Sequence, residues 1–426
     1  MKPWRVLVFP GGTEIGLEIN KSLRDCKEVE LFSAGDDVSN HAPFVFRHHH
    51  FVPSIREAGW LERLNQVITE ERIDFVFPAH DDVIVALAEA GHDLRAAVVS
   101  SPLDSCRLTR SKSATYACLA GVLPVPVVHL PPLPDHCYPV FVKPDRGQGS
   151  QGAQAVRNAQ ELAVAMAAVD DPLVLELLPG DEYTVDCFTD REHGVMYSRG
   201  RQRVRTRAGI SMDSRPVHDP AFEAYAAAIA RHIPLCGAWF YQVKRRATGQ
   251  LVVMEVGPRI AGTMALARVE GVNLPLLSLY EQARQPVTIR PNAFTVTIDR
   301  ALVNRYSHSL AFSTVYVDLD DTLLLRGRVN LELVRLIYQW LNEGKRLVLL
   351  TRHARDVHST LRQHRLSALF DEVCHLQAGE PKSAYVTDQD AILIDDSFRE
   401  RMQVQGATGI PTFDCSMLEL LLDDRA

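Results

Sequence analysis

Residues 315–323 read Val-Tyr-Val-Asp-Leu-Asp-Asp-Thr-Leu, which is typical of a buried strand that ends in acidic residues. In the turn that follows a strand, the strict alternation of side chains between two faces is released, so Asp318 and Asp320 can converge on one point. Converging carboxylates can hold Mg²⁺ through their oxygens, while one attacks phosphorus and the other moves a proton. We therefore expect a phosphoryl-transfer site here, with Asp321 as a turn residue.

Three segments downstream carry the other groups that such a site needs. Residues 347–351 form a second predicted strand that ends in a threonine hydroxyl. Lys382 follows a proline in a polar segment, and residues 391–396 form a third predicted strand that ends in two aspartates. The order Asp-x-Asp-x-Thr, strand-Thr, Lys and strand-Asp-Asp resembles the haloacid dehalogenase (HAD) phosphohydrolase superfamily, over roughly residues 309–426.

This resemblance implies roles for individual residues. The implied catalytic residues are Asp318 as the nucleophile that forms an aspartyl-phosphate, Asp320 as general acid and base, and Thr351 and Lys382 at the phosphoryl oxygens. The implied Mg²⁺ ligands are Asp318, Asp320 and one or both of Asp395 and Asp396. Residues 319–350 and 352–381 must each provide a crossover of at least ~10–12 residues between parallel strands. They therefore leave no room for an inserted cap domain, and we expect a capless HAD-like Rossmannoid domain.

The N-terminal part alternates predicted strands and helices. Strands are expected at 5–9, 29–33 and 75–77, and helices from Leu17, at 60–70 and from Asp82. This alternation is typical of a parallel, doubly wound α/β sheet. The glycine turn at 10–16 does not have the spacing Gly-x-Gly-x-x-Gly, and no acid stands at the very end of the second strand, where it could hold a ribose. We therefore expect no nicotinamide site.

A second constellation begins with Lys143, which ends a predicted strand. The loop that follows, residues 146–152, contains three glycines. Glycines let backbone N–H groups approach phosphate oxygens, and the lysine adds positive charge. A plain surface loop would have a similar composition, so this signal is weak until other motifs support it.

Three further motifs support a nucleotide site. They are Ser-Lys-Ser at 111–113, Glu-Leu-Leu-Pro-Gly-Asp-Glu at 176–182, and Gln242 followed by Glu-Val-Gly-Pro-Arg at 255–259. The acids of the last two motifs stand at the ends of predicted strands. Together the motifs resemble the ATP-grasp superfamily, and most closely its carbamoyl-phosphate-synthetase-like branch, over about residues 1–305.

The ATP-grasp resemblance also implies roles for individual residues. The implied nucleotide-binding residues are Lys112 and Lys143 at the phosphates, the loop residues Gly147, Gly149, Ser150 and Gly152 over them, Glu176, Leu177 and Leu178 at the adenine, and Glu182 at the ribose. The implied metal ligands are Gln242 and Glu255, and Arg259 would stabilise the phosphoryl group in flight. Arg203 and Arg207, in a predicted basic hairpin at 196–211, are candidates for anion contacts.

One position departs from the ATP-grasp pattern. That family usually has Asn two residues after the metal-binding Glu, and Gly257 stands there in this chain. A glycine has no side chain to ligate, so we expect a second metal to be weaker or held differently. Glu255 as an ordinary surface acid is the alternative at this motif.

Some patterns also have ordinary structural interpretations. The tract His48 to His50 lies on a predicted strand, where consecutive side chains point to opposite faces, so we expect an edge segment rather than a metal site. Arginines alternate with other residues at 201, 203, 205 and 207, which predicts one basic face, either solvated or anion-binding.

Residues 108–125 are expected to form one helix.

Composition limits the class of protein. The 426 residues predict about two to four domains, with 46% hydrophobic and 23% charged residues as in a globular protein. A net charge of -7 argues against a nucleic-acid partner. The eight cysteines have no Cys-x-x-Cys pair, no apolar run approaches the ~20 residues of a membrane span, and Lys2 leads straight into a strand without a signal peptide. We therefore expect a cytoplasmic protein with no membrane partner.

The expected architecture combines α/β and α+β domains. They are a glycine-turn pre-ATP-grasp α/β domain at 1–104, an ATP-grasp fold at 105–305 and the HAD-like domain at 306–426. We expect a bifunctional enzyme that ligates a small carboxylate to an amine through an acyl phosphate and hydrolyses a phosphorylated small molecule. Its cofactors would be ATP and Mg²⁺, with Mn²⁺ and a homodimer left open. The alternatives are a nucleotide-sensing module that regulates the phosphatase, and a ligase whose HAD-like domain only recognises phosphate.

Overall fold

The computed structural model describes residues 2–147 and 149–425. The chain divides into two compact units, residues 1–302 and 303–426. The boundary that we predict between residues 104 and 105 lies within the first unit. No helix in the described ranges combines the length and the apolar character that crossing a bilayer requires. All eight cysteines are free thiols.

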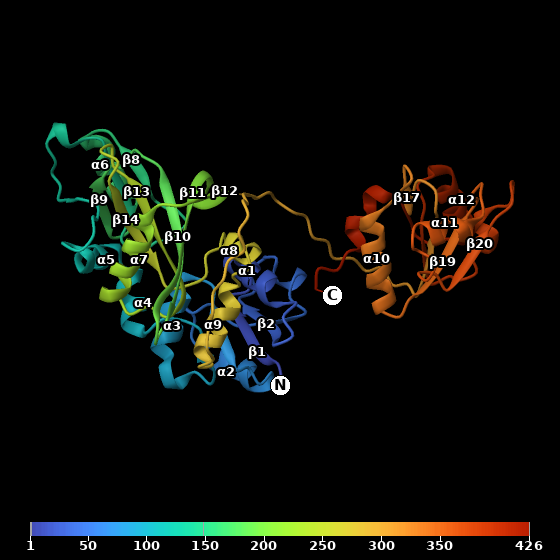
Figure 1. Cartoon of the computed structure of the whole chain (residues 1–426), viewed down its shortest axis with the longest axis horizontal. Coiled ribbons are helices and arrows are strands. Elements are labelled where there is room, and N and C mark those ends of the chain that lie inside the picture. Colours follow the sequence, from blue (N-terminus) through green and yellow to red (C-terminus); the bar gives the residue numbers. More distant parts are fainter. Residues whose placement is uncertain (1, 148, 426) are drawn as a thin grey trace. The chain divides into compact units, whose positions relative to one another are not determined.

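A five-stranded parallel sheet, in the order β3-β2-β1-β4-β5, forms the N-terminal part of the first unit. Figure 1 labels its strands β1 and β2 and the helices α1, α2 and α3. Its strands and main helices are β1 (Trp4–Phe9), α1 (Glu14–Leu23), β2 (Val29–Gly35), β3 (His48–Phe51), α2 (Trp60–Glu70), β4 (Phe75–Pro78), α3 (Asp81–Ala90) and β5 (Ala97–Val98). Alternate residues of β1 enter two different cores, Val6 and Val8 on one face and Leu7 and Phe9 on the other. Both faces are therefore covered, as parallel sheets require, and the predicted α/β sheet is confirmed.

The turn after β1 brings α1 very close to the end of the sheet. A Cβ on Gly16 would lie 2.4 Å from the carbonyl oxygen of Gly11, so only glycine allows this approach. Thr13 caps the helix by accepting a hydrogen bond from the N–H of Gly16 at 2.9 Å. The histidine tract lies on β3, which is an edge strand of this sheet, as the sequence predicts.

The predicted helix over residues 108–125 is wrong. The structure has two helices there, α4 (Leu103–Arg110) and α5 (Lys112–Leu119). Ser111 between them is extended, with φ −103° and ψ 123°, and its hydroxyl accepts a hydrogen bond from the N–H of Ala114. A serine that caps a helix ends the regular pattern before it, because the cap residue has non-helical backbone angles.

Two antiparallel sheets complete the first unit. The four-stranded sheet has the order β6-β9-β7-β8 and the six-stranded sheet the order β14-β13-β10-β11-β12-β15. Their strands are β6 (Val128–His129), β7 (Val140–Pro144), β8 (Gln154–Val156), β9 (Pro172–Glu176), β10 (Glu182–Asp190), β11 (Gly194–Arg207), β12 (Ile210–Val217), β13 (Gly237–Arg245), β14 (Leu251–Gly257) and β15 (Ile298–Asp299). The helices that accompany them are α6 (Ala159–Ala167), α7 (Pro220–His232), α8 (Ala265–Val269) and α9 (Leu274–Gln282).

Helix α7 covers one face of the six-stranded sheet. Its Phe222, Ala226 and Ile229 share a buried cluster with Val185 of β10 and Tyr241 of β13. Side chains alternate along a strand, so the neighbouring residues of β10 and β13 point to the opposite face. That opposite face carries the polar residues of the candidate site.

The second unit contains a five-stranded parallel sheet in the order β20-β19-β16-β21-β22. Its elements are β16 (Thr314–Val317), β17 (Leu324–Leu325), β18 (Arg328–Val329), α10 (Leu331–Asn342), β19 (Arg346–Thr351), α11 (Val357–Gln363), β20 (Glu372–His375), β21 (Ala391–Ile394), α12 (Phe398–Thr408) and β22 (Thr412–Phe413). Val315 and Val317 enter one core and Tyr316 enters another, so β16 is buried on both faces. Between β16 and β19 the elements are a two-stranded hairpin and α10.

Candidate functional site

The first unit encloses a cavity of about 540 Å³. Both antiparallel sheets and the turn after β1 contribute to its lining. The predicted nucleotide-site residues that line it are Lys112, Lys143, Gly147, Gly149, Ser150, Glu176, Leu177, Leu178, Glu182, Gln242, Glu255 and Arg259. Gly152 is outside the lining, and Gln148 of the same loop lies outside the described residues. Residues that are far apart in the sequence are therefore brought to one cavity.

The period of a β-strand explains why these side chains meet. On β10, Tyr183 and Val185 are in the core under α7, whereas Glu182 and Thr184 line the cavity. On β13, Tyr241 and Val243 are in the core and Gln242 and Lys244 line the cavity. One face of the sheet is thus apolar and packed, while the other presents charged and amide groups to the cavity.

The two lysines have different surroundings. Lys112 is buried, and its Nζ donates hydrogen bonds to the backbone carbonyls of Asp145 at 3.2 Å and Gly147 at 3.1 Å. These two hydrogen bonds hold the first residues of the glycine loop in place. Burial, together with the positive charge of Lys112, lowers the pKa of Lys143 to about 8. An anion placed beside Lys143 would stabilise its charged form.

Both acids predicted near the base and ribose are already paired. Glu176 forms hydrogen bonds with Nε of Arg246 at 3.0 and 3.1 Å, and it also accepts one from the backbone N–H of Val127 at 2.9 Å. Glu182 lies 2.9 Å from Nε of Arg203 and 3.9 Å from Nζ of Lys244. Arg246 therefore holds the carboxylate of Glu176, and the adenine contact of residues 176–178 stays a prediction.

Gln242 and Glu255 form a small oxygen-ligand set. They are register partners on the neighbouring strands β13 and β14, and both line the cavity. Directly opposed residues of an antiparallel pair place their side chains on the same face, ~4.5–5.5 Å apart at Cβ. An amide oxygen and a carboxylate fit a Mg²⁺ ion that takes its other ligands from phosphate and water.

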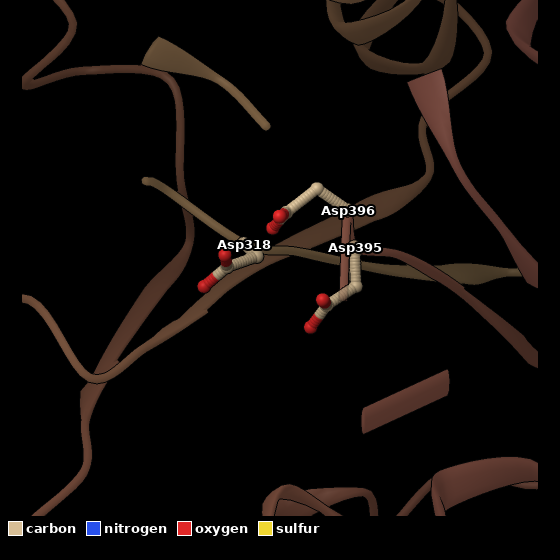
Figure 2. Close-up of side chains that lie close together, drawn as sticks. All are labelled: Asp318, Asp395 and Asp396. Carbon is tan, nitrogen blue, oxygen red and sulfur yellow. The ribbon is translucent and has the colours of Figure 1, made fainter. Parts of the chain in front are cut away.

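The second unit brings three aspartates together at the ends of neighbouring strands. Asp318 follows β16, and Asp395 and Asp396 follow β21, which pairs with β16 in parallel. Figure 2 shows their carboxylates grouped in one place, and the oxygens that could hold a metal lie within 4.8 Å of one another. Asp318 and Asp395 are buried, whereas Asp396 is exposed. Three carboxylates with one exposed member fit a Mg²⁺ site that opens to solvent.

Lys382 lies between two of these aspartates. Its Nζ is 2.7 Å from Oδ1 of Asp318 and 2.6 Å from Oδ2 of Asp395. Burial raises the pKa of Asp318 to about 6, although Lys382 opposes the shift, and Asp395 adds to it. Burial would lower the pKa of Lys382, but the two carboxylates raise it above its usual value. The lysine therefore stays charged and compensates two buried acids.

Asp395 and Asp396 have distinct partners. The two oxygens of Asp395 accept hydrogen bonds from Lys382 and from the backbone N–H of Ser397, the latter at 2.8 Å. Thr322 is fully buried, and its hydroxyl contacts Oδ1 of Asp396 at 3.3 Å and accepts a hydrogen bond from the N–H of Asp396 at 3.0 Å. Asp396 is thus the more open of the two acids.

Asp320 lies outside the group of three and has a partner that the sequence does not reveal. Its carboxylate is 2.9 Å from Nδ1 of His353, whose Nε2 is 2.8 Å from the hydroxyl of Thr360.

The other predicted residues of this segment are also placed by the structure. Thr351 is buried at the end of β19. Asp321 has a φ of 53° in the turn, as predicted. Ligation of a metal by Asp320 stays a prediction.

Residues 168–304 match the model of a family described as "ATP-grasp in the biosynthetic pathway with Ter operon". The first unit has an ATP-grasp fold. No curated protein matches the sequence. Among solved structures, the chain is similar to a biotin carboxylase domain of 2-oxoglutarate carboxylase from Hydrogenobacter thermophilus, complexed with MgADP, ADP and bicarbonate (14% identity, TM-score 0.57, 68% of this chain and 72% of that chain).

Two other solved structures share the fold. One is an L-amino acid ligase from Bacillus licheniformis (18% identity, TM-score 0.54, 68% of this chain and 78% of that chain). The other is a pyruvate carboxylase from Rhizobium etli (18% identity, TM-score 0.55, 66% of this chain), of which the match covers only 28%. At these identities the similarity concerns the fold.

The basic hairpin of the ATP-grasp unit does not have the single basic face that the sequence predicts. Arg201 and Arg203 line the cavity, whereas Arg205 is exposed and forms an ion pair with Asp299 at 2.8 Å. The pairing of β11 with β12 shifts register between Arg203 and Arg205, so the alternation of faces is interrupted there. Arg207 is exposed and is not part of the lining.

Sequence reasoning missed other cavity residues, among them Thr13, Glu14, His80 and Arg300. Glu14 begins α1 within the glycine turn at 10–16, and Arg300 follows β15, which pairs with β12. Arg300 belongs to no motif, and the glycine turn was considered only as a nicotinamide site. The signal available for Glu14 is its place at the carboxyl end of a parallel strand, where ligands of α/β sheets bind.

Proposed function

We propose that this protein is an ATP-dependent carboxylate–amine ligase whose active site is the cavity of the ATP-grasp unit. One observation carries the proposal: the cavity collects Lys112, Lys143, Gln242 and Glu255 opposite a glycine loop. Two cations and two oxygen ligands are the groups that a nucleoside triphosphate with its Mg²⁺ requires. The cavity volume of about 540 Å³ is also within the usual range for small-molecule sites.

The cavity residues would have separate roles in binding the nucleotide and the metal. Lys143 and the loop residues Gly147, Gly149 and Ser150 bind the phosphates, and Leu178 lies against the base. Gln242 and Glu255 would hold Mg²⁺, which supplies charge neutralisation between the phosphates. Phosphorylation of the carboxylate gives an acyl phosphate, because hydroxide is a poor leaving group and phosphate a good one. The amine then displaces phosphate.

Two arginines of the cavity could stabilise the negative charge that shifts between oxygens during phosphoryl transfer. Arg201 is bound to both oxygens of Asp186, at 2.8 and 3.0 Å, and its buried Nη1 has no hydrogen-bond partner among the described residues. Arg203 lies beside it on the same strand and also lines the cavity. These side chains are fixed before the substrate arrives, so their charge needs little reorganisation during phosphoryl transfer.

ATP binding by single-site variants tests this function. Lys143→Ala should weaken binding of ATP about tenfold to a hundredfold, because a charge-assisted phosphate contact is worth roughly 1.5–3 kcal/mol. Glu255→Gln should reduce turnover more than binding. Exposed Arg290, outside the cavity, provides a control as Arg290→Gln. Unchanged ATP consumption in both cavity variants would contradict the assignment.

The aspartate group of the second unit favours a second activity, Mg²⁺-dependent hydrolysis of a phosphomonoester. The observation that favours this activity is a buried lysine, Lys382, which contacts both Asp318 and Asp395 and lies next to the exposed Asp396. This arrangement agrees with the HAD-like pattern of the sequence. Asp318 would attack phosphorus to form an aspartyl-phosphate, and Lys382 and Thr351 would stabilise the phosphoryl oxygens.

Asp320 would act as the general acid and base in this second reaction. Its carboxylate is more than half exposed and is held by His353, so it lies at the open side of the site. Asp318 and Asp396, with Asp395 beside them, would hold Mg²⁺, which supplies Lewis-acid activation of the phosphate. Release of phosphate from simple phosphomonoesters with Mg²⁺ and without ATP tests this activity.

A further inference from the structure

Glu14 and Arg300 lie next to Gly262 in the lining of the ATP-grasp cavity. All three residues line the cavity. A methyl group on Gly262 would lie 3.5 Å from Nη1 of Arg300 and 3.6 Å from Cβ of Glu14. The side chain of Glu14 and the guanidinium of Arg300 therefore both border the space that Gly262 leaves open.

Neither Glu14 nor Arg300 forms a close ion pair with another residue in the described ranges. Elsewhere in the cavity, opposite charges are paired: Arg201 with Asp186, and Arg259 with Asp81. Glu14 has neither an ion pair nor a hydrogen-bond partner for its carboxylate among residues 2–147 and 149–425. Arg300 forms no close ion pair in the same ranges, although its charge acts on Glu14 through space, and the contact of its Nη1 with the carbonyl of Ser211 is long, at 3.5 Å. Two half-buried charges of opposite sign are thus left for a ligand.

The surroundings of Glu14 agree with a site for a cation. Burial raises the pKa of Glu14, while Arg300 and Arg259 pull it in the opposite direction. A bound ammonium would favour the charged carboxylate and offset the cost of burial. Arg300 offers a guanidinium whose geometry matches a carboxylate in a bidentate contact.

We propose that Glu14 and Arg300 bind the ammonium and the α-carboxylate of a free α-amino acid, which is the amine substrate of the ligase. This inference rests on the proposed ligase function and names the class of its nucleophile. An α-amino acid carries both charges on one carbon, so it satisfies both residues across the space beside Gly262. A simple amine or a simple carboxylate would satisfy only one.

Glu14 would also take part in the chemistry of the amine, because a carboxylate beside an ammonium can accept its proton. Glu14 accepts one proton from the ammonium, which frees the nitrogen lone pair. The nitrogen forms a bond to the acyl carbon, the bond from that carbon to the phosphate oxygen breaks, and its electron pair leaves with phosphate. The second proton of the nitrogen goes to the departing phosphate, so the step is balanced.

Binding measurements on the full-length protein test the site without requiring turnover. The probes are the twenty standard amino acids, their N-acetyl derivatives and their carboxamides, titrated with Mg²⁺ and a non-hydrolysable ATP analogue present. At least one free amino acid should bind, and each of its blocked forms should bind about tenfold more weakly or worse, because a charge-assisted contact is lost. Absence of binding by every amino acid overturns the proposal.

Variants assign the two contacts. Glu14→Gln should remove the discrimination against the N-acetyl form, and Arg300→Gln that against the carboxamide. Gly262→Ala should weaken binding of the free amino acid, because the methyl group enters the space between the two charges at ordinary contact distances. Glu62→Gln and Arg290→Gln remove an exposed acid and an exposed arginine outside the cavity and serve as matched controls. Discrimination that is the same in Glu14→Gln, Arg300→Gln and the controls overturns the proposal.

ADP release separates this inference from the proposed function. If amino acids bind with the predicted pattern but no carboxylate supports ADP release, the subsite stands and the ligase function fails. If simple amines support ADP release and amino acids do not, the ligase function stands and the amino-acid subsite is overturned.

Discussion

The ring of Phe240 fills the space that a side chain on Gly257 would need. The two residues are register partners on β13 and β14, and a Cβ on Gly257 would lie 2.5 Å from Cε1 of Phe240. The same ring lies 4.9 Å from the guanidinium of Arg259. The glycine that departs from the ATP-grasp pattern is therefore matched by an aromatic neighbour, and the structure leaves no room for an asparagine ligand.

This packing predicts the effect of restoring the usual residue. Gly257→Asn should destabilise the protein by about 1–3 kcal/mol, because an overpacked core forces side chains and backbone to shift. It should not increase ATP turnover. Denaturant unfolding and ADP release measure the two effects, and Gly406→Asn, at an exposed glycine of α12 with open space around it and no positive φ, is the control. A stable Gly257→Asn variant with faster turnover would contradict the packing argument.

ATP binding should depend on pH through Lys143. Its pKa in the free protein is lowered to about 8, so its positive charge is present below pH 8 and lost above it. ATP favours the charged form, and binding above pH 8 must therefore take up a proton and weaken by as much as about tenfold per pH unit. Calorimetry at pH 7 and pH 9, in buffers of different ionisation enthalpy, measures this uptake. Lys143→Arg should remove it because arginine stays charged, and uptake that persists in Lys143→Arg would exclude Lys143 as its source.

Arg259 should have a large effect on stability as well as on activity. Its Nη2 donates to Asp81 at 3.0 Å, and both side chains are largely buried. Removing one partner of a buried ion pair leaves an uncompensated charge, which costs about 3–5 kcal/mol. Arg259→Ala should therefore unfold at clearly lower denaturant, and Asp81→Asn should also be destabilised, because it leaves the buried guanidinium of Arg259 without its carboxylate. Equal stability of Arg259→Ala and the unchanged protein would rule out this structural role.

Asp318→Asn should separate the two proposed activities. An amide cannot attack phosphorus as a carboxylate does, so phosphomonoester hydrolysis should be lost. ATP-dependent ligation should persist, since its residues belong to the other unit. Asp321→Asn is the matched control, because Asp321 lies in the same segment at a positive φ that asparagine tolerates. Loss of ligation in a folded Asp318→Asn variant would show that the two sites are not independent.

Much of the fold is predictable from local patterns. The strands that end at Phe9, Lys143, Glu176 and Val317 all occur within about a residue of their expected ends, because hydrophobic runs and turn residues mark them. The helix break at Ser111 was not predictable from hydrophobicity, since the serine hydroxyl replaces backbone hydrogen bonds at a helix start. The split of the basic hairpin between Arg203 and Arg205 arises from a register shift that no sequence period reveals.

The site was predictable only where motifs are contiguous or stand at strand ends. Asp318, Asp395 and Lys382 meet because parallel neighbouring strands end at the same edge of the sheet. Arg300 reaches the cavity through the short strand β15, and His353 reaches Asp320 from the segment after β19. These contacts depend on tertiary packing, and single residues in loops carry no periodic signal for it.

ADP formation from Mg-ATP, with mixtures of carboxylates and amines, tests the ligase assignment most directly. The full-length protein should release ADP only when both substrates are present, with a condensed product detected by mass in equal amount. Glu255→Gln should lose most of this release while it still binds ATP. ADP release that is independent of the carboxylates and amines, or unchanged by Glu255→Gln, would contradict the account.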